Sequence, residues 1–95
     1  MELIKEKELS KIIKNNFNLK EILLELDGIV EGHISFVKAV CQYKHKEGVL
    51  YIFDLLNNMK MNLVYQYRIL YDEKNKILMI NSDNGQDIKL TVLEK

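Results

Sequence analysis

The sequence predicts an α+β fold in which two short N-terminal helices precede a five-stranded antiparallel meander, all within one domain covering residues 1–95. Apolar residues recur at helical spacing up to about residue 26 and then alternate with a period of two. Turn residues separate the alternating stretches at short intervals, which is typical of antiparallel sheets. Ninety-five residues are enough for a single core. The sheet either stays open beneath the helices, curls into a small barrel, or pairs through an edge strand with a second copy.

The N-terminal segment carries the two helical patterns. The apolar face of the first helix is formed by Leu9, Ile12, Ile13 and Phe17. A second helix is expected over 19–26, because Asn18 and Glu21 have the spacing of a capping box and an apolar repeat follows. A strand over 20–27 is the alternative interpretation of this short run.

The rest of the chain predicts strands. Residues 48–93 read as an antiparallel meander that extends back to His33, with expected strands at 33–43, 49–56, 62–72, 76–81 and 87–93. Residues 57–60 are expected to form a loop. Asn84 and Gly85 give the strongest turn signal, because this pair suits a hairpin loop that needs positive φ.

Charge and cysteine content narrow the functional classes. Fourteen basic residues balance fourteen acidic ones, so the surplus of cations that non-specific nucleic-acid binding requires is missing. Zero net charge also favours association with partners or copies. A single cysteine, no signal-peptide pattern and no long apolar run indicate a cytoplasmic protein that does not enter a membrane.

Few residues suggest catalysis or metal binding. His33 and Cys41 lie eight residues apart on one expected strand, which is roughly 26 Å and too far for a shared site. Cys41 and His45 could approach across a strand end, but a buried thiol beside an exposed turn histidine is the favoured interpretation. We therefore expect no enzyme activity, no cofactor and no metal site.

A tyrosine stripe is the feature with most functional promise. Tyr65, Tyr67 and Tyr71 share one face of the expected strand 62–72, and Arg68 lies on the other. The stripe either packs beneath the helices, anchors a protein interface, or stacks nucleobases. With the basic turn residues Lys44 and Lys46, these six positions are the candidate partner-binding residues.

Two short segments resemble the Sm-like RNA-binding barrels. Residues 26–34, LDGIVEGHI, are similar to the early Asp-Gly strand turn of that family, and Met61, Asn62 and Leu63 are similar to its Met-Asn-Leu loop. The resemblance implies a helix followed by a five-stranded barrel. The segments lie farther apart than the family spacing, and no counterpart of its second motif is present, so the chain is not assigned to it.

The leading functional hypothesis is a non-catalytic interaction protein that binds a protein partner, with a homodimer through a sheet edge as one form of association. Abundant Lys, Asn and Ile indicate an AT-rich genome, so a phage- or mobile-element-encoded inhibitor of a host bacterial protein is the specific expectation. The alternative is a nucleic-acid or nucleotide-binding small β-barrel, Sm-like or OB-like, using the tyrosines and lysines.

Overall fold

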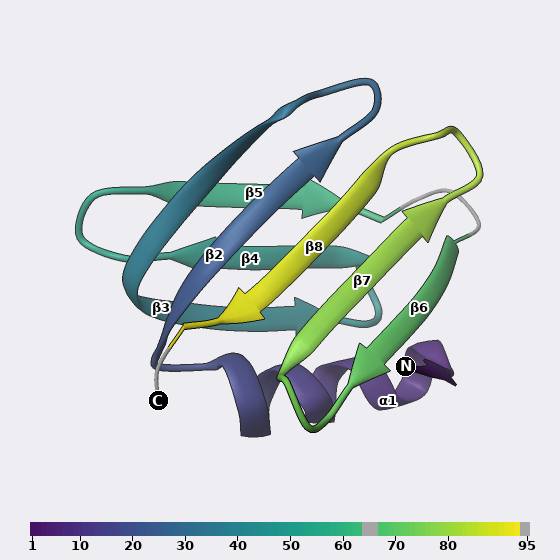
Figure 1. The fold of residues 1–95 in the computed structure, drawn as a ribbon, viewed down its shortest axis with the longest axis horizontal. Helices are drawn as coiled ribbons and strands as arrows, with labels where there is room; N and C mark the ends of the chain where they lie inside the picture. The colour runs from purple at the N-terminus through teal and green to yellow at the C-terminus, as the bar shows by residue number, and fades with distance from the viewer. Residues whose placement is uncertain (64–66, 94–95) are drawn as a thin grey trace.

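The computed structural model describes residues 1–63 and 67–93, with only the backbone of Tyr67. Within these residues, one helical segment accompanies one eight-stranded antiparallel sheet (Figure 1). The strands are β1 (Glu2–Ile4), β2 (Lys20–Asp27), β3 (Gly32–Lys44), β4 (Val49–Phe53), β5 (Asn58–Asn62), β6 (Tyr67–Asp72), β7 (Ile77–Ser82) and β8 (Asp87–Val92). Their order in the sheet is β1-β6-β7-β8-β2-β3-β4-β5.

The prediction of two helices and a five-stranded meander is therefore wrong. Strands β1, β2 and β5 were not expected, and residues 48–93 do not form one continuous meander. Strands β4 and β5 are neighbours, and so are β6, β7 and β8, but β5 and β6 lie far apart in the strand order. Strand β8 pairs with β2 as well as with β7, so the last strand connects the two parts of the sheet.

The single helical segment comprises α1 (Glu6–Ile12) and a π-helical turn, η1 (Ile13–Phe17). Leu9, Ile13 and Phe17 are completely buried and lie four residues apart. A spacing of four exceeds the 3.6-residue period of an α-helix, so a wider π turn keeps the third side chain on the core face. The N–H of Asn18 closes this turn by donating to the carbonyl of Ile13 at 2.9 Å.

The expected second helix is instead the central strand β2, as in the alternative interpretation of residues 20–27. Its neighbours β3 and β8 supply hydrogen-bond partners on both sides, and Ile22 and Leu24 alternate into the core. Asn18 does not cap a helix, because its side-chain oxygen accepts the N–H of Cys41 at 3.0 Å. Tertiary pairing thus outweighs a local helical pattern.

Strand β3 is bent by a β-bulge. Lys20 pairs with Ala39, but Ile22 pairs with Phe36, so Val37 and Lys38 together oppose one residue of β2. Both bulge residues point outward, and the buried positions change from even to odd numbers beyond the bulge. For this reason the face that Ile34 and Phe36 share does not continue to Val40 with simple alternation.

The bend divides the sheet into two layers. The first part of β3 pairs with β2, and its second part, Val40–Lys44, pairs with β4. In Figure 1, β2, β8, β7 and β6 run diagonally across the front, while β4 and β5 cross behind them and α1 lies along the lower end. The core lies between the layers and the helical segment; its fully buried side chains include Leu9, Ile13, Phe17, Ile22, Leu24, Phe36, Leu50, Ile52, Leu78 and Leu90. The helix found in the described residues is too short to cross a membrane.

Candidate protein-interaction site

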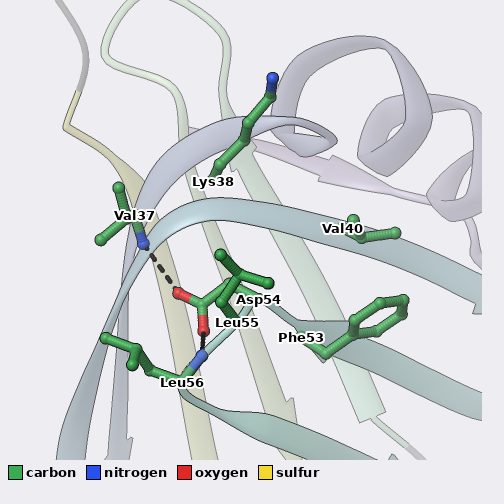
Figure 2. A pocket seen from close by; sticks show the side chains of 7 residues that line it. All are labelled: Val37, Lys38, Val40, Phe53, Asp54, Leu55 and Leu56. Atoms are coloured by element: carbon green, nitrogen blue, oxygen red, sulfur yellow. Dashed lines mark hydrogen bonds between the residues drawn. The ribbon is translucent and has the colours of Figure 1, made fainter.

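An apolar pocket lies where the bend of β3 meets the turn between β4 and β5. Its volume is about 480 Å³. Figure 2 shows its lining, formed by Val37, Lys38, Val40, Phe53, Asp54, Leu55 and Leu56. Lys38 is directed away from the apolar side chains, so aliphatic and aromatic carbon dominates the walls.

Most of the apolar side chains that line this pocket are exposed to solvent. Leu55 is fully exposed, and Leu56 and Val37 retain 80% and 68% of their accessible surface. Phe53, at the end of β4, is also exposed. Single exposed apolar residues are common on protein surfaces, whereas a contiguous group that lines a concavity is typical of a binding surface.

Asp54 organises the turn that presents the two leucines. Its Oδ1 accepts the N–H groups of Leu56 and Asn57, both at 2.8 Å, and its Oδ2 accepts the N–H of Val37 at 2.9 Å. The backbone hydrogen bonds from Leu56 and Asn57, and then that from Val37, hold the pKa of the Asp54 carboxyl below its ordinary value. One carboxylate thus fixes both walls of the pocket (Figure 2).

The bulge explains why Val37 is available to Asp54. The last pairing between β3 and β4 joins Val40 to Phe53, so the N–H of Val37 lies beyond the ladder. Strand β4 supplies no backbone acceptor for this N–H, and the carboxylate of Asp54 accepts it instead. Asn57 reinforces the same junction, because its side-chain nitrogen donates to the carbonyl of Ser35 at 3.3 Å.

Within the described residues, the tyrosine stripe does not form an exposed surface. Tyr71 is buried, with its ring centroid 6.1 Å from that of Phe17. Tyr65 and the side chain of Tyr67 lie outside the described residues. Arg68 is exposed on β6. An exposed stripe therefore cannot include Tyr71.

The two candidate lysines lie near the turn between β3 and β4, and both are exposed. Lys46 is in the turn itself. Lys44 ends β3 and places its Nζ 5.2 Å from the ring centroid of Tyr51. This tyrosine, on β4, was not among the predicted site residues.

The cysteine and histidine candidates do not form a reactive pair. Cys41 is buried, and desolvation raises the pKa of its thiol to about 12, which keeps it protonated. His45 instead places Nδ1 3.3 Å from Oε1 of Glu6, the same oxygen that accepts the Tyr43 hydroxyl at 2.6 Å. These contacts join α1 to the end of β3. Across the described ranges, no group of three or more His, Cys, Asp or Glu residues is arranged to hold a metal ion.

Sequence reasoning missed the pocket because it extended the expected strand through residue 56. Asp54 was the available signal, since aspartate is uncommon in strands and favours turns. Two leucines followed by two asparagines then mark a turn with an apolar tip. The long-range contact with Val37 has no local signature, because it depends on the bulge in β3.

No protein-family model matches the chain, and neither a curated protein nor a solved structure shows significant similarity to it.

Proposed function

We propose that this chain is a non-catalytic interaction protein that binds an apolar segment of another protein in the pocket beside the β4–β5 turn. The observation that carries the proposal is the exposure of Leu55 and Leu56 at the rim of a pocket with apolar walls. Transfer of one leucine side chain out of water contributes about 1.5–3 kcal/mol. Two such side chains can therefore supply much of the binding free energy of a short segment.

The preformed turn adds to this argument. Two hydrogen bonds to Asp54 already fix the backbone that carries the leucines, and a third, from Val37, ties this turn to β3. A partner would then not have to order the turn, so less conformational entropy opposes binding. Loops that are held rigidly by a scaffold are common sites of recognition.

Nucleic-acid binding is less well supported. Tyr71 is buried, and Phe53 is the one aromatic side chain among the residues that line the pocket, whereas single-stranded nucleic acids stack successive bases on several rings. That the chain inhibits a bacterial host protein, and that it pairs with a second copy through a sheet edge, both stay predictions.

A selection experiment tests the proposal. A random short-peptide display library is panned on the immobilised protein, and the enriched peptides are then measured for binding by fluorescence anisotropy. We expect peptides rich in aliphatic residues whose affinity falls at least about tenfold with Leu55→Asp or Leu56→Asp, because an aspartate leaves an unpaired charge in an apolar contact. Leu3→Asp is the matched control, since Leu3 is also exposed but lies on β1.

The proposal fails if no peptide is enriched, or if the enriched peptides bind equally to the Leu55→Asp, Leu56→Asp and Leu3→Asp variants. Circular dichroism on each variant verifies that the fold is retained. All three positions are exposed, so loss of folding is not expected.

A further inference from the structure

The strands beside the pocket carry two lysines on the same outer surface. Lys44 on β3 and Lys60 on β5 place their Nζ atoms 5.2 and 5.9 Å from the ring centroid of Tyr51 on β4. Both distances lie within the range of cation–π attraction. The ring therefore holds two cations on the outer face of the rear layer.

Strand register places Lys60 next to the pocket and Lys44 one step farther. The pairs closest to the pocket join Val40, Phe53 and Asn58, and the next outward-facing set joins Gln42, Tyr51 and Lys60. Lys44 lies opposite Val49 in the set beyond, and its Nζ extends over the Tyr51 ring. Residues i and i+2 of a strand share a face and lie about 7 Å apart. One short segment bound on this face therefore reaches both the apolar walls and the lysines.

The nearby carboxylates are not paired with these lysines. Asp54 is engaged by three backbone N–H groups, and Glu47 accepts the Tyr51 hydroxyl at 3.5 Å. Over residues 1–63 and 67–93, neither Lys44 nor Lys60 makes an ion pair with a carboxylate. The pocket thus adjoins a cationic surface on a chain with zero net charge.

We infer that the partner segment is acidic as well as apolar, with aspartate or glutamate side chains that face Lys44 and Lys60 while an aliphatic side chain occupies the pocket. This inference rests on the proposed function, because it specifies the chemistry of the segment bound at that site. Complementary charge fixes the orientation of a segment and accelerates its association, effects that salt screens.

The experiment uses three synthetic peptides and the full chain. The first contains two leucines flanked by glutamates, the second has lysines in place of the glutamates, and the third keeps the glutamates but replaces the leucines with serines. We expect the acidic apolar peptide to bind about tenfold more tightly than the basic one at low salt, with a smaller difference at high salt. The polar acidic peptide should bind weakest.

Substitutions locate the charge effect. Lys44→Gln and Lys60→Gln should each weaken the acidic apolar peptide about two- to fivefold and leave the basic peptide unweakened. Lys89→Gln is the matched control, because Lys89 lies on β8, in the front layer.

The outcomes separate this inference from the proposed function. Equal binding of the acidic and basic apolar peptides, both lost with Leu55→Asp, would overturn the acidic preference and leave the apolar pocket as the binding site. Binding of neither peptide would refute both. Salt-sensitive binding of oligouridine that is lost with Lys44→Gln and Lys60→Gln would assign the surface to nucleic acid and overturn the inference.

Discussion

At the residue scale, Asp54 connects the backbone of β3 to the turn after β4. Its carboxylate accepts three backbone N–H groups, and no side chain of similar shape without a charge can replace all of them equally well. The pocket therefore depends on a charged group that contributes almost nothing to the apolar lining itself.

Protonation of Asp54 at acidic pH should loosen the pocket. Because the folded-state pKa of Asp54 is lowered, its stabilising effect is complete above the ordinary carboxyl value and is lost as the pH falls through the lowered pKa. In an NMR titration, the amide signals of Val37, Leu56 and Asn57 should shift together, with a midpoint below the ordinary value of 3.8. Asp54→Asn should abolish this transition; a midpoint at or above the ordinary value would contradict the assigned contacts.

Gly28 occupies a position where the packing leaves no space for a side-chain Cβ atom. It has a φ of 129°, and a Cβ at this residue would lie 2.2 Å from the carbonyl oxygen of Gly85, in the turn between β7 and β8. Gln86 fastens the same junction, because its side chain accepts the N–H of Val30 at 2.7 Å and donates to the carbonyl of Val30 at 3.0 Å.

Gly28→Ala should lower the free energy of unfolding by about 3 kcal/mol or more, since backbone strain and a clash with main-chain atoms combine. Gly32→Ala is the matched control: its φ is 149°, but no atom lies within 4 Å of the added Cβ. Urea unfolding measures both variants. If Gly28→Ala and Gly32→Ala lose the same free energy of unfolding, the close contact between Gly28 and Gly85 does not contribute to stability.

At the element scale, the two edge strands limit unwanted pairing. Strand β1 has only three residues, and β5 carries Lys60 at its centre, opposite Tyr51. Short edges and edge lysines both oppose the addition of further strands. Residues 58–62 also read the same in both directions, so an antiparallel pair of β5 strands centred on this position would bring two Lys60 side chains together.

Lys60→Val should therefore promote self-association, because it removes this repulsion and adds a β-branched residue at an open edge. Light scattering over a range of protein concentrations measures the average mass. Lys89→Val removes the same charge from the central strand β8 and should leave the mass unchanged. If the average mass of Lys60→Val is no higher than that of Lys89→Val, a feature other than charge blocks the edge of β5.

The elements differ in how far the sequence predicts them. Strands β3, β7 and β8 follow directly from alternation and turn residues, within one or two positions. The apolar residues of β2 have helical spacing, and this segment is a strand because it pairs with both β3 and β8. Strand β1 has only three residues, and its partner β6 is distant in sequence. Strand β5 pairs with the preceding strand β4, but asparagine and lysine at three of its five positions give little strand signal. The bulge at Val37 and Lys38, and with it the pocket, depends on register, which no local pattern encodes.

At the scale of the whole molecule, one core joins the two crossed layers to the helical segment. Cys41 lies in this core, and its thiol pKa of about 12 compares with an ordinary value of 9.0. The unfolded thiol ionises as the pH rises past that ordinary value, whereas the folded thiol stays protonated. Stability should therefore decrease between the ordinary and the raised pKa.

Alkylation of Cys41 tests this burial. At a pH near the ordinary thiol value, iodoacetamide should react at least about a hundredfold more slowly with the folded chain than with the chain in urea, because the thiolate is the reactive form. Cys41→Ala should also show a smaller loss of stability at alkaline pH than the unchanged protein. Rapid labelling of the folded chain would contradict the placement of Cys41 in the core.

The position of β8 between β2 and β7 has a consequence for folding on the ribosome. Residues 87–92 complete hydrogen bonding to a strand that began at residue 20. While the chain is being synthesised, the facing edges of β2 and β7 stay open until β8 has emerged from the exit tunnel. The front layer is therefore completed only when β8 inserts, and a nascent chain should bind chaperones until then.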